Sequence, residues 1–239
     1  MHCYIASCVF TSKYPELSNK IQDYVASLGK LSTVRCCVPG WKEKIYEDKM
    51  PVGAYAERWR ALPQSHIFLP EDIIWSLCPN CMNIIEEWRN VKNVHSLWEL
   101  IDQDDSFEFP NYSDMRVTLQ DCWRMRDRTA THEAVRSLLT KMRIDYEELK
   151  DRREQADFCG KSLYRPQVSR NPALAPKHYK ANTEGLFVEH TEDEQNRIMM
   201  EYCKCYTTDT VICYCHYCLE GVLAGGVKGL HLAELLFSH

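Results

Sequence analysis

Two kinds of hydrophobic pattern alternate along this chain. Between Tyr14 and Gly29, apolar residues recur at helical spacing on one face, with Pro15 at a suitable helix start and Gly29 at a suitable stop. Short apolar runs typical of buried strands surround this helix and recur later, at residues 3–8, 31–37, 72–77, 115–122 and 208–215. A second helix is predicted over 132–142, and a weaker strand before residue 159. This alternation predicts an α/β fold in which parallel sheets are flanked by helices.

The chain also repeats itself. The segment Cys78–Ile101 and the segment Cys215–Leu236 both open with C-x-x-C, continue into an apolar-periodic stretch, reach V-K-x-[VL]-H and end in Glu-Leu-aliphatic. We therefore predict two pseudo-symmetric repeats, each a small parallel sheet flanked by helices, over residues 1–106 and 107–239. The polar stretch at 102–116, which contains Pro110, serves as the linker.

Two segments interrupt the symmetry of the repeats. Residues 41–71 and 164–193 show no regular pattern, and the second contains three prolines and several basic residues. Loops of this length are often functional, so each segment is either a cover over a site or plain surface.

The net charge and the hydropathy of the chain argue against two classes of protein, those that bind nucleic acid and those that insert into a membrane. The formal net charge is -5, which argues against nucleic-acid binding because such proteins usually carry a basic stripe. The first residues resemble no targeting segment, and the late apolar stretch from Val211 to Val227 is interrupted by His216 and Glu220. We expect a cytoplasmic protein with no membrane insertion.

Cysteine is unusually frequent in this chain. The chain has 13 cysteines in 239 residues, and they are grouped. In a reducing compartment, grouped cysteines indicate metal ligation or thiol redox chemistry more than disulfides. The alternative is that they are simply small buried hydrophobic residues.

The grouped cysteines follow the same order in both halves, a single cysteine, then an adjacent pair, then C-x-x-C. The first half has the complete set, Cys8, Cys36, Cys37, Cys78 and Cys81. The second half has Cys122, Cys159, Cys215 and Cys218, with Phe158 at the first position of the pair. Most of them follow predicted strands, and the carboxyl ends of parallel strands are where ligands gather.

This order, with the flanking segments YIASCVFTSKYP, CCVPG and QDCWRMR, resembles the cysteine-rich CCG domain of the heterodisulfide reductase B subunit and of the lactate-utilisation protein A family. The resemblance implies iron–sulfur ligation, with a non-cubane 4Fe-4S cluster held by the five cysteines of the first half. Thiolates are soft ligands that suit such clusters. Pro39 and Gly40 would turn the chain away after the adjacent pair.

The second half departs from this pattern. Its four matching cysteines would hold a conventional 4Fe-4S cluster or form a degenerate site. Cys213, two residues before Cys215 on the same strand, is a further candidate ligand. Zinc held by C-x-x-C pairs is the alternative metal.

Basic and imidazole side chains supply further candidates. Arg124 and Arg126 follow Cys122, where they either pair with an anionic substrate and offset cluster charge or form a solvated surface pair. His95 and His231 are repeat-related, and we expect them on a helix after the C-x-x-C helix, as capping or core residues more than as proton donors. No nucleotide- or flavin-binding motif is present, so electrons should come from an iron–sulfur or flavin partner protein.

The predicted function is that of an oxidoreductase subunit similar to the heterodisulfide reductase B subunit. Catalysis would take place at the cluster held by Cys36 and Cys37, where a disulfide or related small molecule is reduced. The alternative is an electron-transfer or assembly subunit of a complex that oxidises hydroxyacids such as lactate or glycolate.

Overall fold

The computed structural model describes residues 1–41, 43–64, 67–181 and 183–237, which form two compact units. The first unit comprises Met1–Leu97 together with Phe237, and the second comprises Trp98–Leu236. Each unit contains one sheet. The strands of the first sheet all precede residue 106, where we predict the repeat boundary, and the strands of the second sheet all follow it.

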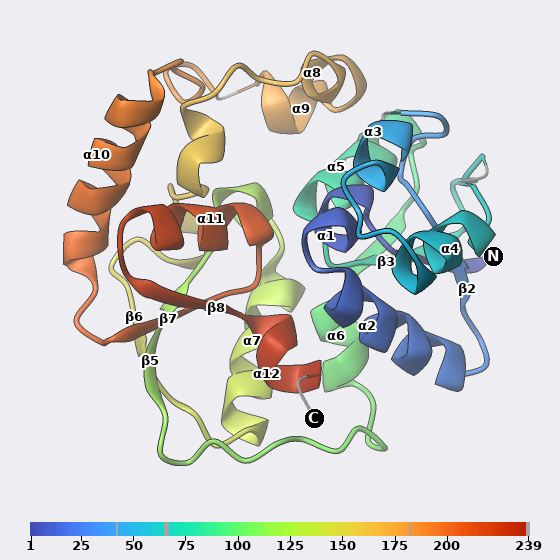
Figure 1. Cartoon of the computed structure of the whole chain (residues 1–239), viewed down its shortest axis with the longest axis horizontal. Coiled ribbons are helices and arrows are strands. Elements are labelled where there is room, and N and C mark those ends of the chain that lie inside the picture. Colours follow the sequence, from blue (N-terminus) through green and yellow to red (C-terminus); the bar gives the residue numbers. More distant parts are fainter. Residues whose placement is uncertain (42, 65–66, 182, 238–239) are drawn as a thin grey trace. The chain divides into compact units, whose positions relative to one another are not determined.

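The first sheet has four parallel strands in the order β2-β1-β3-β4, of which β2 and β3 are labelled in Figure 1. The strands are β1 (His2–Ile5), β2 (Ser32–Val34), β3 (Ile73–Ser76) and β4 (Asn93–Ser96). The helices of this unit are α1 (Cys8–Lys13), α2 (Pro15–Ser27), α3 (Glu43–Glu47), α4 (Ala54–Ala61) and α5 (Pro79–Trp88). Helix α2 packs against β2, and α5 packs against β3 and β4.

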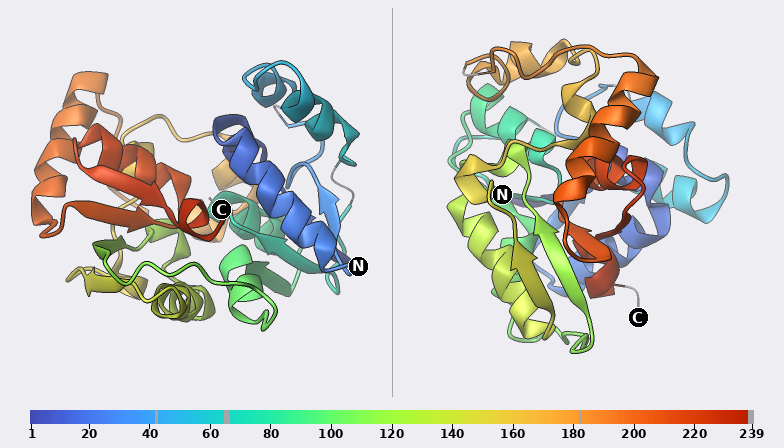
Figure 2. Two further views of the ribbon diagram at one scale, coloured as in Figure 1. Left: turned by 60° about the horizontal axis from the view of Figure 1, so that its bottom comes forward. Right: turned by 90° about the vertical axis from the view of Figure 1, so that its left-hand side faces the viewer.

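The second sheet has the equivalent order, β6-β5-β7-β8, and is also parallel throughout. Its strands are β5 (Arg116–Gln120), β6 (Asp145–Glu148), β7 (Thr210–Cys213) and β8 (Lys228–His231). The helices that lie wholly or mostly in this unit are α6 (Leu97–Asp102), α7 (Thr129–Lys141), α8 (Arg170–Leu174), α9 (Pro176–Tyr179), α10 (Glu192–Tyr202), α11 (His216–Ala224) and α12 (Leu232–Phe237). Helix α11 packs against β7 and β8, and α10 packs against α11 (Figure 2).

The shared strand order confirms the predicted fold class of two parallel sheets flanked by helices. Strands buried on both faces show no alternation of buried and exposed positions, as in β7, where all four residues are buried. Because the strands are parallel and in register, their carboxyl ends lie at one edge of each sheet. Gln120, the last residue of β5, is level with Cys213, the last residue of β7.

Several local predictions were wrong. His95 and His231 lie on the short strands β4 and β8, not on a helix after the C-x-x-C helix. These two strands, four residues each, were not expected. The capping role is confirmed for His231, because its Nδ1 accepts the backbone N–H of Ala233 at 3.2 Å.

The second strand of the second sheet, in chain order, also lies elsewhere than expected. Strand β6 ends at Glu148, well before Cys159, and the intervening chain includes a 3-10 turn at Arg153–Gln155.

The two long segments predicted to be irregular contain short helices. The first carries α3 and α4, and the second carries α8 and α9. Within these segments Lys42, Ser65, His66 and Asn182 lie outside the described residues. None of the helices in the described ranges has the length and apolar character needed to cross a membrane.

Candidate metal centre

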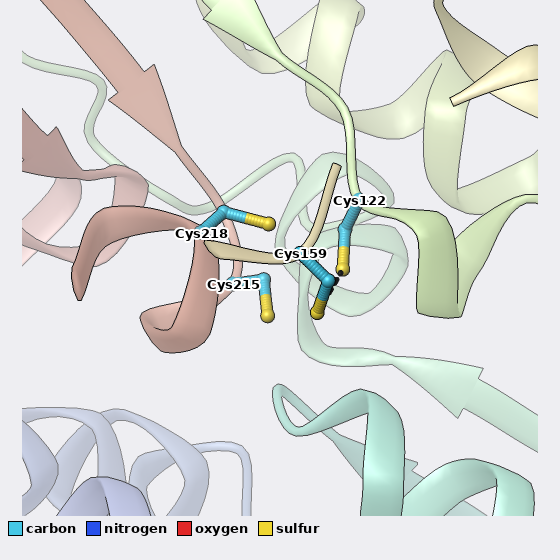
Figure 3. Close-up of side chains that lie close together, drawn as sticks. All are labelled: Cys122, Cys159, Cys215 and Cys218. Carbon is cyan, nitrogen blue, oxygen red and sulfur yellow. Dashed lines mark hydrogen bonds between the residues drawn. The ribbon is translucent and has the colours of Figure 1, made fainter. Parts of the chain in front are cut away.

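Four cysteines of the second unit converge on one point. The sulfur atoms of Cys122, Cys159, Cys215 and Cys218 all lie within 4.8 Å of one another, and all four residues are buried (Figure 3). Among the described residues, this is the one group of three or more potential metal ligands gathered so closely. Four soft thiolates around one point are the donor set of a zinc or iron–sulfur site, so these residues fit a metal centre.

Neighbouring parallel strands deliver three of the four sulfurs. Cys122 follows β5, and Cys215 follows β7 and occupies the position directly before α11. Cys218 lies in the first turn of α11, where the spacing C-x-x-C directs both sulfurs to the same side. This arrangement confirms that cysteines gather at the carboxyl edge of the second sheet.

The fourth sulfur depends on two glycines. Cys159 precedes the 3-10 turn Gly160–Leu163, which packs directly on α11. A Cβ atom at Gly160 would lie 2.0 Å from the carbonyl oxygen of Tyr217, and one at Gly221 would lie 2.4 Å from the Cα of Gly160. Gly160 also has a φ of 57°, which favours glycine. The main chain at Gly160 therefore contacts the main chain of α11, and this contact places the sulfur of Cys159 beside that of Cys218.

Phe158 connects the loop of Cys122 to the loop of Cys159. Its carbonyl oxygen accepts the backbone N–H of Trp123 at 2.9 Å and the thiol of Cys218 at 3.7 Å. Its ring stacks on Tyr202 with the ring centroids 4.1 Å apart. The residue that replaces the missing cysteine is thus a core side chain, and its main chain organises the site.

Arg124 provides a buried positive charge beside the sulfurs. Its Nε donates to the Sγ of Cys159 at 3.2 Å. Burial alone would raise the pKa of the Cys159 thiol, but hydrogen bonds from the other three thiols and the charge of Arg124 lower it well below its usual value. Burial raises the pKa of Cys122 and of Cys218, so Cys159 is the thiol most readily ionised of these three.

Aromatic rings surround the Arg124 guanidinium. Its Cζ lies 5.2 Å from the ring centroid of Tyr179 and 5.8 Å from that of Phe187, both in the segment 164–193. Trp123 and Tyr217 complete the cage at 5.7 and 5.4 Å. Of the two alternatives for this segment, its contacts with Arg124 favour a cover over the site. Arg126 is half-buried instead, with its guanidinium 4.4 Å from the Trp123 ring centroid.

Asp121, directly before Cys122, anchors the end of β5. It accepts from Arg136 at 2.6 Å and from the hydroxyl of Tyr214 at 2.7 Å, and that hydroxyl accepts the N–H of Cys122 at 3.3 Å. Burial would raise the pKa of Asp121, but Arg136 lowers it below its usual value, so the carboxylate is charged. We did not predict this network, although an Asp-Cys pair at a strand end was visible in the sequence.

The cysteines of the first unit occupy the equivalent edge of the first sheet. Cys8 begins α1 after β1, Cys36 and Cys37 follow β2, and Cys78 caps α5, which contains Cys81. All five are buried. Ser7, with a φ of 63° in the left-handed region, turns the chain between β1 and Cys8.

Three of these first-unit thiols interact with one another. Hydrogen bonds from Cys81 and from the Asn80 amide lower the pKa of Cys78 to about 6 against the effect of burial. Hydrogen bonds with Cys37 and Cys78 raise the pKa of Cys81 well above its usual value. The amino end of α5 is thus directed at the Cys78 sulfur, and a cluster held by all five cysteines stays a prediction.

The remaining cysteines differ in position. Cys213, the further candidate ligand, is buried on β7 but is not among the four sulfurs gathered in the described part of the second unit. Cys3 is buried on β1, as expected. Cys203 is buried with its thiol 3.8 Å from the carbonyl oxygen of Val222, and Cys205 is exposed.

No protein-family model matches the chain, and no curated protein matches it significantly.

Proposed function

We propose that the chain is an iron–sulfur oxidoreductase subunit, similar to the heterodisulfide reductase B subunit, which reduces a disulfide or related small molecule at a cluster in its first unit. The observation that supports this most is the placement of buried cysteines at the carboxyl edge of both parallel sheets. In the second unit four of these thiols also lie within 4.8 Å of one another, which their order in the sequence alone would not require.

The first unit supplies the residues for the redox cluster. Cys8, Cys36, Cys37, Cys78 and Cys81 would hold it, and the cluster would supply one-electron transfer and iron atoms that bind thiolate. The amides at the amino end of α5 already point to the Cys78 sulfur, so they would offset negative charge there.

The reaction needs two electrons and two protons for each disulfide. The S–S bond breaks, both sulfurs are reduced to thiols, and the electrons come from a partner iron–sulfur or flavin protein. The absence of a nucleotide-binding motif in the sequence is the reason for proposing a partner.

Electron paramagnetic resonance of the anaerobically purified, oxidised protein tests this function. If the first-unit cluster is catalytic, an added thiol or disulfide should change its signal, because substrate sulfur approaches the iron. The protein should be brown and contain about four irons and four acid-labile sulfides in its first unit.

The variant Cys205→Ser is the control, because it removes an exposed thiol that could react with the added disulfide. If neither the thiol nor the disulfide changes the signal, the result would favour the alternative function of an electron-transfer or assembly subunit. Protein without iron and sulfide would refute the proposal altogether.

A further inference from the structure

The spacing of the second-unit sulfurs distinguishes one metal ion from a cluster. A tetrahedral ion bound to four thiolates at about 2.3 Å places its sulfurs about 3.8 Å apart. In a cubane each thiolate lies outside its own iron, so the cysteine sulfurs are about 6.4 Å apart. The four sulfurs here lie within 4.8 Å of one another, and the pair Cys122–Cys159 is 3.7 Å apart.

The backbone around the sulfurs opposes widening to the cubane spacing. The Trp123–Phe158 hydrogen bond ties the Cys122 loop to the Cys159 loop at 2.9 Å. The close approach of Gly160 and Gly221 ties the Cys159 loop to α11, which carries Cys218. With the main chain held in this way, roughly 2 Å of further separation would have to come from rotation of the four buried cysteine side chains within closely packed surroundings.

The place of the missing cysteine is filled by an aromatic ring. Phe158 is buried between Tyr202 and Gly221. Its ring stacks on the ring of Tyr202, and it lies so close to Gly221 that no Cβ would fit there. The first unit instead has both cysteines of its adjacent pair. The two halves of the duplication therefore present different ligand sets in different surroundings.

We propose that Cys122, Cys159, Cys215 and Cys218 hold a single Zn²⁺ ion as a closed four-thiolate centre, so that the second unit carries a stabilising ion and the first unit carries the redox cluster. The assignment of iron and sulfide to the first unit rests on the proposed function, whereas the zinc site rests on the sulfur geometry. Zinc is favoured over ferrous iron because thiolate sites bind it more tightly. With all four positions occupied by protein, the ion has none open for substrate.

Charge is consistent with a closed centre. Four thiolates and Zn²⁺ carry a net charge of about -2, and the buried Arg124 guanidinium, which donates to Cys159 at 3.2 Å, partly neutralises it. Tyr179 and Phe187, the two residues of the aromatic cage that belong to the segment 164–193, cover that guanidinium. A stabilising ion needs this shielding, whereas a substrate site needs access.

The test counts metals in the full chain purified without oxygen. Wild-type protein should contain about one zinc per chain, and zinc-edge X-ray absorption should show four sulfur neighbours at about 2.3 Å. The double variant Cys215→Ser with Cys218→Ser should lose the zinc and keep iron and acid-labile sulfide. The matched double variant Cys78→Ser with Cys81→Ser, at the repeat-related C-x-x-C, should lose iron and sulfide and keep the zinc.

The outcomes separate this inference from the proposed function. If the double variant Cys215→Ser with Cys218→Ser loses iron or sulfide, the zinc site is overturned and the proposed function is unaffected. Zinc with four sulfur neighbours in a protein devoid of iron and sulfide supports the zinc site and refutes the function. If the serine variants do not fold, X-ray absorption of the wild-type protein decides, and fewer than four sulfur neighbours or no zinc overturns the inference.

Discussion

Replacing Gly160 by alanine should disrupt the second-unit centre, because two separate penalties meet at this residue. Its φ of 57° is left-handed, which costs an L-residue about 1–2 kcal/mol. Its new Cβ would also lie 2.0 Å from the carbonyl oxygen of Tyr217, and such overpacking adds about 1–3 kcal/mol. Gly160→Ala should therefore cost about 2–5 kcal/mol of unfolding free energy.

Gly226 offers a matched control. Its φ of 80° is also left-handed, but a Cβ there would meet nothing within 4 Å, so Gly226→Ala carries only the conformational cost. The assay is equilibrium urea unfolding of both variants, with the metal content of each measured before the titration. With a slope near 2 kcal/mol per molar urea, the midpoint of Gly160→Ala should lie about 1 M below that of Gly226→Ala.

The two variants should also differ in metal content. Gly160→Ala should lose the metal bound in the second unit, because the alanine pushes Cys159 away from α11, while Gly226→Ala keeps it. Equal midpoints and equal metal contents would refute the claim that close backbone packing places Cys159.

Two further predictions concern the charges beside the sulfurs. Asp121→Asn should cost about 2 kcal/mol in urea unfolding because it removes one of the two carboxylates that pair with the buried Arg136, the other being Glu148. Glu147→Gln, at an exposed ion pair with Arg116, should change stability far less, and equal losses would contradict the reasoning. Arg124→Met should weaken metal binding about tenfold in chelator competition at neutral pH, because the donor to Cys159 is lost. Arg126→Met should leave the affinity close to wild type, and an equal loss there would show that Arg124 has no specific role.

Most of the framework of this protein followed from local patterns. The alternation of helical and extended stretches predicted parallel sheets, and parallel strands place their carboxyl ends, and so Cys122 and Cys215, at one edge. The C-x-x-C spacing at a helix start added Cys218. These inferences need only the period of each element and the direction of the strands.

The fourth strands were harder to recognise. Strands β4 and β8 are four residues long and contain Lys, Asn, Gly and His, which are not typical of buried strands. They pair because β3 and β7 offer a free edge, a property of the assembled sheet and not of the short segment.

The sequence by itself determined the duplicated α/β architecture, the grouping of the cysteines and the loss of one cysteine at Phe158, because periodicity and spacing are local properties. Only the tertiary structure decided how closely the four sulfurs approach, that Arg124 donates to Cys159, and that Tyr179 and Phe187 cover it. Those features depend on distances between segments far apart in the chain. Packing fixes such distances through contacts like that of Gly160 with α11, and no pattern within one segment specifies them.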